Sequence, residues 1–138
     1  MIKDLKDKIQ LESMLGMLGC SMQVIKRLNK DFKTVLQERD GIAEIRTEDK
    51  SVAWRFTLYN GKLSIARGTH PCADYAMVYQ DVPTALEIFK DGSPEASLAA
   101  MTEGKLKFEG DLEFGMWFNE RLQGLGELMK EPKNIISL

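Results

Sequence analysis

The sequence predicts an α+β fold in which a small five-stranded sheet has its helices gathered on one face. Three observations support this fold class: an amphipathic helical segment near the N-terminus, a run of strand-like segments in the middle, and two short helices, a fifth strand and a final helix toward the C-terminus. The chain has 138 residues, a length that suits one domain with its own core.

The N-terminal segment, residues 3–38, reads as helical. A weak point is expected at Gly16-Met17-Leu18-Gly19, because each glycine costs about 1 kcal/mol relative to alanine in a helix interior. The heptad spacing of the apolar positions is interpreted as packing of a helix pair on its own domain, and the alternative is a dimer seam in which Asn29 fixes the register. The positions in question are Leu11, Leu15, Leu18, Met22, Ile25, Asn29, Phe32 and Leu36.

The middle of the chain predicts antiparallel strands. The first segment is a weak candidate because Ile42 and Ile45 fall on opposite faces. The second is a strong one, because one of its faces is formed by Val52, Trp54, Phe56 and Leu58. Asn60-Gly61 predicts a two-residue type I′ hairpin turn, which needs positive φ at both central residues. The four segments are residues 42–48, 51–59, 62–67 and 74–80, with a loop over 68–73 before the last.

The C-terminal third predicts two short helices, a fifth strand and a final helix. Proline early in each short helix and glycine at its end follow the usual asymmetry of helix termini, and Asp111 is expected to cap the final helix. Pro132 is expected to end that helix and leave a short tail. The elements run from Asp81 or Val82 to Gly92, Ser93 to Gly104, Lys105 to Glu109 and about Leu112 to Lys130.

Composition and charge argue against several classes of function. The net charge is −2 and the basic residues are scattered, so a nucleic-acid partner is not expected. Cys20 and Cys72 lack the spacing of a zinc site or a disulfide framework, which favours a reducing cytoplasm and no bound metal. Charged residues soon after Met1 argue against a signal peptide, and no apolar run approaches the ~20 residues of a membrane span.

Catalytic groups are sparse, and the sequence predicts a protein that is not an enzyme. His70 is the single histidine. In His70-Pro71-Cys72 a thiol lies near an imidazole, but the intervening proline disfavours the mutual geometry of a nucleophile pair. Asp111 and Glu113 are explained as a cap and as a first-turn partner of the helix dipole. The sequence has no glycine-rich phosphate-binding pattern.

The final helix carries more apolar bulk than one packing face needs. This pattern fits two interpretations equally, a tight core or a pocket lined by the surplus side chains. Eight methionines in the chain add side chains that repack around guests of different shape. The apolar stripe is Phe114, Phe118, Leu122, Leu125 and Met129, widened by Trp117 and Leu128, while Leu112 and Met116 begin a second face.

Several segments resemble the sterol carrier protein 2 (SCP-2) domain. The most specific is Gly104-Lys105-Leu106-Lys107-Phe108-Glu109-Gly110-Asp111 with the apolar helix after it. The others are Ala73-Asp74-Tyr75-Ala76-Met77-Val78, Asp81 with the helix around Leu86 to Phe89, Trp54-Arg55-Phe56 and Asn60-Gly61-Lys62. The similarity covers residues 25–130 of a single domain, 1–138, with residues 1–24 as an N-terminal helical extension and 131–138 as a tail.

The resemblance implies a largely antiparallel five-stranded sheet covered by helices, with an apolar tunnel between the layers. It implies a lipid carrier without catalytic residues or cofactor, which holds a sterol, fatty acid, fatty acyl-CoA or similar ligand and contacts membranes transiently. The alternative is an accessory or dimerisation module that presents lipid or a surface to a partner enzyme, including a homodimer formed through the N-terminal helices.

The implied tunnel lining comes from the two short helices, the fifth strand and the start of the final helix. The three rings at that start are bulkier than the residues usual in the family, and they would narrow or divide the tunnel. The lining residues are Leu86, Phe89, Leu98, Met101, Phe108, Leu112, Phe114, Trp117 and Phe118.

Overall fold

The structure is a computed structural model that describes residues 2–131 and 133. Its helices and strands follow the predicted order, and of the predicted tail only Glu131 and Lys133 are described, so the rest of that tail, Pro132 included, lies outside the described residues. In chain order the elements are α1 (Ile2–Leu28), α2 (Lys30–Leu36), β1 (Gly41–Thr47), β2 (Ala53–Tyr59), β3 (Lys62–Arg67), β4 (Tyr75–Tyr79), α3 (Val82–Asp91), α4 (Pro94–Thr102), β5 (Leu106–Gly110) and α5 (Leu112–Lys130).

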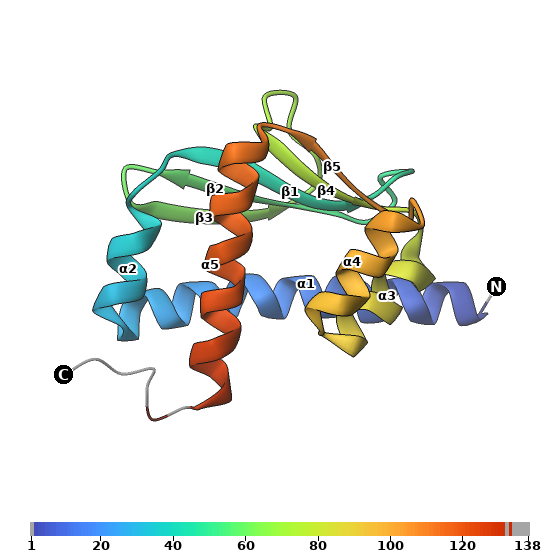
Figure 1. Cartoon of the computed structure of the whole chain (residues 1–138), viewed down its shortest axis with the longest axis horizontal. Helices are drawn as coiled ribbons and strands as arrows, with labels where there is room; N and C mark the ends of the chain where they lie inside the picture. Colours follow the sequence, from blue (N-terminus) through green and yellow to red (C-terminus); the bar gives the residue numbers. More distant parts are fainter. Residues whose placement is uncertain (1, 132, 134–138) are drawn as a thin grey trace.

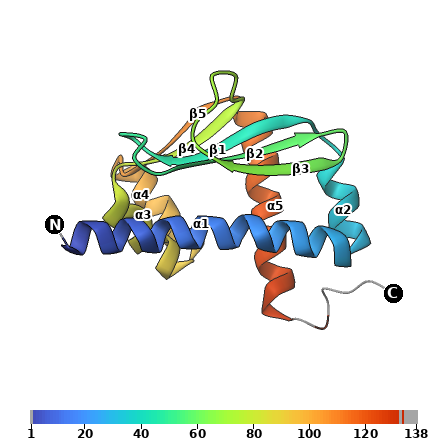
Figure 2. The same cartoon turned by 180° about the vertical axis from the view of Figure 1, so that it is seen from behind.

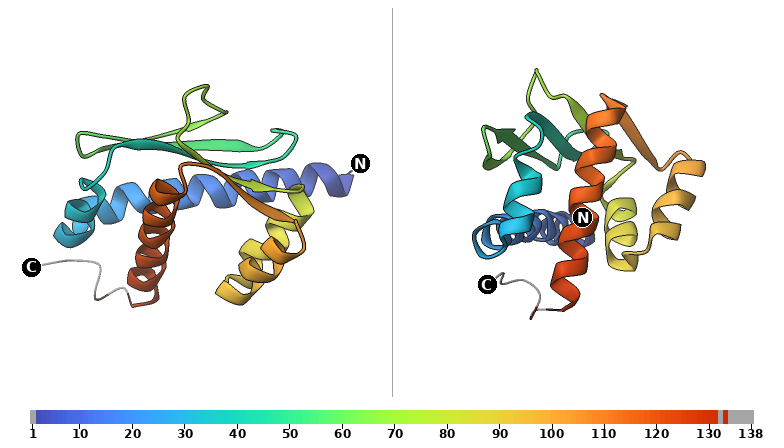
Figure 3. Two further views of the ribbon diagram at one scale, coloured as in Figure 1. Left: turned by 45° about the horizontal axis from the view of Figure 1, so that its top comes forward. Right: turned by 60° about the vertical axis from the view of Figure 1, so that its left-hand side comes forward.

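The strands form one five-stranded sheet in the order β3-β2-β1-β4-β5. Three of the neighbouring pairs are antiparallel, and β1 pairs with β4 in parallel. All the helices lie against one face of this sheet, with α5 descending from its edge between α2 on one side and α3 and α4 on the other (Figures 1 and 3). The predicted α+β class, with a largely antiparallel sheet covered by helices, is confirmed.

Local chemistry sets the element ends as the sequence predicts. Asn60 and Gly61 have φ of 50° and 78°, as a type I′ turn requires. The N-cap side chains of α3, α4 and α5 each accept a hydrogen bond from the backbone N–H three residues later, which satisfies a donor that the helix leaves unpaired. These bonds join Asp81 to Thr84, Ser93 to Ala96 and Asp111 to Phe114.

The prediction of a weak point at Gly16–Gly19 is wrong, because α1 continues through it without a break. The two glycines instead allow the helix to approach the sheet closely. A Cβ at Gly19 would lie 2.8 Å from Cγ2 of Ile65, and one at Gly16 would lie 3.4 Å from the ring of Trp54. Packing against β2 and β3 therefore offsets the low helix propensity of glycine.

Polar contacts hold α1 along the same side of the sheet. Glu12 accepts a hydrogen bond from Nε1 of Trp54 at 3.1 Å and forms an ion pair with Arg67. Further along the helix, the side-chain amide of Gln23 donates to the backbone carbonyl of Leu63 on β3. Seen from behind, α1 crosses the whole molecule beneath the strands (Figure 2). The predicted N-terminal extension is thus packed on the domain and continuous with it.

The break between α1 and α2 occurs at Asn29. Its side-chain oxygen accepts from the backbone N–H of Phe32 at 2.9 Å, so Asn29 caps α2. The heptad side chains are buried within this one chain, except for Leu18, which is half-buried, so packing on the protein's own domain accounts for their spacing. A homodimer through the N-terminal helices stays a prediction, and it would have to use the opposite face of α1.

Candidate functional site

An aromatic cluster fixes the start of α5 in the core. Phe114, Trp117 and Phe118 are 3 %, 8 % and 0 % exposed. The ring of Phe118 lies 5.8 Å from that of Phe56 on β2, and the ring of Phe114 lies 5.7 Å from Trp117 and 6.4 Å from Phe118. The three rings predicted to narrow the tunnel therefore pack on one another and on the sheet.

Tyr75 of β4 anchors the next turn of α5. A Cβ added to Gly115 would overlap its ring, with Cζ at 2.7 Å and two ring carbons nearer still. The side-chain amide of Asn119 donates to the Tyr75 hydroxyl oxygen at 3.1 Å. Burial raises the pKa of Tyr75 to about 12, because the phenolate would lose its hydration in this contact. The first turns of α5 are thus packed closely on the sheet.

The nine predicted lining residues fall into three groups. Leu86 and the three α5 rings belong to the core. Phe89 and Phe108 are half-buried, with ring centroids 5.2 Å from Tyr79 and 6.0 Å from Tyr75. The third group is exposed on the surface and consists of Leu98, Met101 and Leu112. A tunnel lined by all nine stays a prediction.

A pocket of about 390 Å³ lies on the other flank of α5, facing α2. Its apolar wall comes from side chains of both helices, while Gly124 leaves room because a Cβ there would meet nothing within 4 Å. The volume falls within the usual range of small-molecule sites, about 300–1,000 Å³. The lining residues are Asn29, Asp31, Phe32 and Val35 from α2 and its cap, and Glu120, Arg121, Gly124 and Leu128 from α5.

Arg121 organises the polar side of this pocket. Its guanidinium makes ion pairs with Glu38 at 3.5 Å, beyond the end of α2, and with Glu120 at 3.3 Å. The same group lies over the ring of Trp117, 5.6 Å from the centroid. Two carboxylates therefore already neutralise Arg121, and Asp31 adds a further negative charge to the part of the lining that the structure describes.

The sequence-based prediction placed the lining on α3, α4, β5 and the start of α5, and it did not identify the α2–α5 pocket. A signal was present in α5, because Trp117, Arg121, Gly124 and Leu128 recur at steps of four, three and four and so share one helix face. A glycine in such a face leaves a gap in it. The partner helix, however, follows only from the tertiary fold.

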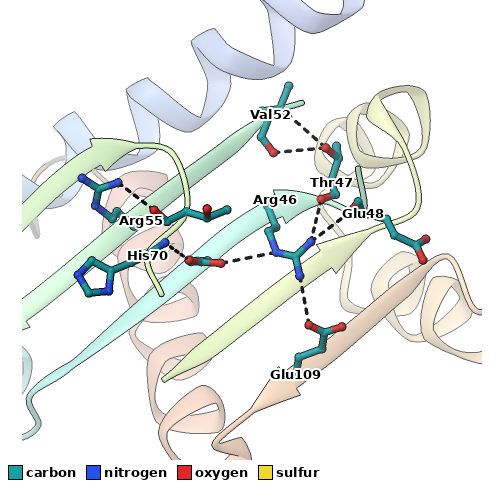
Figure 4. Close-up of polar contacts among 9 residues, drawn as sticks. Arg46, Thr47, Glu48, Val52, Arg55, His70 and Glu109 are labelled. Atoms are coloured by element: carbon teal, nitrogen blue, oxygen red, sulfur yellow. Dashed lines mark hydrogen bonds and ion pairs between the residues drawn. The ribbon is translucent and has the colours of Figure 1, made fainter. Parts of the chain in front are cut away.

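A second polar cluster occupies the sheet face that the helices leave open (Figure 4). The buried carboxylate of Glu44 accepts from the backbone N–H of His70 at 2.6 Å. Arg46 lies between Glu44 and Glu109, at 3.5 Å and 3.2 Å, and Arg55 donates to the carbonyl of Thr69. The bonds to His70 and Thr69 hold the loop between β3 and β4 on the sheet, and the ion pair to Glu109 joins β1 to β5.

Among residues 2–131 and 133, no three His, Cys, Asp or Glu side chains are placed to share a metal ion. Within the same residues, no helix combines the length and apolarity needed to cross a membrane.

Comparison with known proteins identifies the fold. No protein-family model matches the sequence, and no curated protein matches it significantly. Among solved structures, a ubiquinone synthesis protein described as UbiJ-SCP2 matches at a TM-score of 0.53 with 13 % identity, over 91 % of this chain and 99 % of that one. The apo form of sterol carrier protein 2 from Yarrowia lipolytica matches at 0.51 with 17 % identity, over 74 % of this chain and 86 % of its own.

A further similar structure is that of a much larger enzyme. The stereoselective inverting sec-alkylsulfatase Pisa1 from Pseudomonas sp. matches 70 % of this chain at 21 % identity and a TM-score of 0.47, and this chain spans 14 % of the length of that enzyme. A match at that score and coverage says nothing about the activity of this chain. The two sterol carrier protein 2 structures, by contrast, match at TM-scores above 0.5 over 91 % and 74 % of this chain. The chain therefore has the fold of sterol carrier protein 2 domains.

Proposed function

We propose that this protein is a non-enzymatic, cytoplasmic carrier that binds an apolar or acyl-chain lipid in its helix layer and exchanges it with membranes. The observation that supports this function best is the pocket between α2 and α5, with its apolar wall and the open space at Gly124. The fold shared with sterol carrier protein 2 adds to the argument. Sterols, fatty acids and fatty acyl-CoAs are the classes of ligand to test.

The energetics of transfer suit a carrier with few polar contacts. Burying a sixteen-carbon chain yields about 12 kcal/mol against water, at ~0.8 kcal/mol per methylene. Against a bilayer the same transfer yields almost nothing, because the chain is already surrounded by hydrocarbon. Binding and release are then nearly balanced, as exchange between membranes requires.

The outer face of α1 is the proposed membrane contact. Six apolar side chains along this helix are between 41 % and 86 % exposed, and Lys3, Lys6 and Arg27 occupy exposed positions among them. An amphipathic helix of this kind inserts its apolar side chains at the level of the lipid headgroups, where basic residues attract anionic lipids. The six residues are Ile2, Leu5, Ile9, Met17, Val24 and Leu28.

A second candidate is an accessory module that presents lipid to a partner enzyme. The match to the UbiJ-SCP2 ubiquinone synthesis protein over nearly the full length of both chains favours it. Affinity purification of the tagged chain separates the two candidates. A stoichiometric enzyme retained with the protein supports the module, whereas lipid without a protein partner supports the free carrier.

Native mass spectrometry of the purified protein, with lipid extraction, tests the shared claim of lipid binding. The Gly124→Leu variant fills the pocket, and Gly126→Leu is its matched control, because Gly126 lies on the same helix, has equally open space at Cβ and is not part of the lining. We expect Gly124→Leu to lower uptake of a fluorescent fatty acid at least about tenfold, or ~1.4 kcal/mol, with Gly126→Leu unchanged. A wild-type protein that takes up no lipid would contradict the proposal.

A further inference from the structure

The charges around the α2–α5 pocket bear on the head group of its ligand, an inference that rests on the proposed lipid-binding function. The lining that the structure describes contains the carboxylates of Asp31 and Glu120 and the guanidinium of Arg121. Arg121 is paired with Glu120 at 3.3 Å and, from outside the lining, with Glu38 at 3.5 Å. Three carboxylates and one guanidinium leave an excess of two negative charges beside the pocket.

Cations on the neighbouring surface do not offset this excess within the part of the lining that the structure describes. On α2, Lys33 approaches Lys26 of α1, whose pKa is lowered by burial and then by the charge of Lys33. On α5, Lys130 is paired with Glu127 at 3.3 Å. None of these lysines, nor Lys30, is among the described lining residues. The polar side of the pocket is therefore acidic.

An apolar wall completes the pocket and sets the length of chain that it holds. Phe32 of α2 is buried, Val35 of α2 and Leu128 of α5 are half-buried, and Gly124 leaves open space beside them. At roughly 30 Å³ per water-sized group, about 390 Å³ holds on the order of thirteen such groups. That is the size of a twelve-carbon chain with a small head group.

An ammonium head group fits the acidic side, because its three N–H donors meet carboxylate acceptors in charge-assisted hydrogen bonds. A carboxylate head group would compete with Glu38 and Glu120 for Arg121, and Asp31 would repel it. Reversing the sign of the head group reverses its interaction with the excess charge. An amine and a fatty acid of equal length therefore differ by twice the effect of that charge on either one.

We infer that the pocket between α2 and α5 selects a cationic single-chain lipid, a long-chain amine, in preference to a fatty acid of the same length. Asp31 and Glu120 are the specificity-determining residues. The apolar wall of Phe32, Val35 and Leu128 binds the chain without regard to its head group, so a fatty acid still binds, but more weakly.

Isothermal titration calorimetry with dodecylamine and dodecanoate tests this selectivity at about pH 7.5, where the amine carries its proton and the acid does not. Both probes are used below their aggregation concentrations. We expect dodecylamine to bind at least about tenfold more tightly at low salt, and the ratio to fall to about threefold or less at about 1 M NaCl, where charges are screened within ~3 Å. Dodecanoate that binds as tightly as the amine, or more tightly, overturns the inference and leaves the proposed lipid binding intact. If neither probe binds, both proposals fail.

Three variants assign the selectivity to the pocket. Asp31→Asn should lower the ratio of amine to fatty-acid affinity at least about threefold, because it removes one negative charge and keeps the side-chain shape. Glu127→Gln is the matched control, since it removes the same charge from α5 outside the described lining, where Glu127 pairs with Lys130. The inference is wrong if Asp31→Asn leaves the ratio unchanged, or if Glu127→Gln lowers it as strongly. Gly124→Leu, which fills the pocket, should weaken dodecylamine at least about tenfold, and undiminished binding would place the amine elsewhere on the surface and overturn the inference.

Discussion

Alanine at Gly115 and at Gly124 should have opposite effects on stability, although both residues lie within α5. Replacing glycine by alanine in a helix interior favours folding by about 0.8–1 kcal/mol. At Gly124 nothing opposes this gain, because the new Cβ meets open space. At Gly115 the Cβ would overlap the ring of Tyr75, which is 2 % exposed and bonded to Asn119, and such overpacking costs about 1–3 kcal/mol.

We therefore expect Gly124→Ala to raise the free energy of unfolding by about 1 kcal/mol and Gly115→Ala to lower it by up to about 2 kcal/mol. Urea denaturation followed by far-UV circular dichroism measures both, and an unchanged m-value shows that stability changed without a change in the surface exposed on unfolding. Equal stabilisation by the two alanines would refute the close packing of α5 on β4 on which the pocket wall depends.

Three further predictions address the caps, the buried tyrosine and the outer face of α1. Asn29→Ala should lower the free energy of unfolding by about 1 kcal/mol through loss of the α2 cap, and an unchanged urea midpoint would contradict this role. Because the pKa of Tyr75 is raised from 10.0 to about 12 in the folded state, its stabilising contribution is full below pH 10 and is lost as the pH rises toward 12. Urea titrations at pH 9 and 11.5 should show a smaller loss of unfolding free energy for Tyr75→Phe than for the wild-type protein. An equal loss in the two proteins would refute the assignment of this pH dependence to Tyr75. Replacing both Ile9 and Met17 by serine should weaken sedimentation with anionic vesicles at least about tenfold, whereas an unaffected double variant would exclude this face as the membrane contact.

The sequence predicted those features of the fold that depend on neighbouring residues. Asn60-Gly61 specifies its turn, and Asp81, Ser93 and Asp111 specify helix starts, because each acts through its own backbone and the next three residues. The continuity of α1 through Gly16 and Gly19 could not be predicted from neighbouring residues. It depends on Trp54 and Ile65, which lie more than thirty residues away.

Tertiary packing also determined which apolar side chains became buried. Periodicity assigns Leu98, Met101 and Leu112 to apolar positions, but it does not say whether another element covers them, and in the structure they are exposed. The α2–α5 pocket needed a further step, the placement of α5 beside the helix that Asn29 begins. The parallel pairing of β1 with β4 likewise depends on a crossover that no local pattern encodes.

The location of bound ligand is the most direct measurement of the central claim, that this domain binds lipid between α2 and α5. Titrating ¹⁵N-labelled protein with the fatty acid dodecanoate and following the amide resonances by NMR locates the site residue by residue. The account predicts that the largest shifts fall on Phe32, Val35, Gly124 and Leu128, the wall of the pocket. Shifts that avoid these four amides, or no saturable shifts at all, would contradict it.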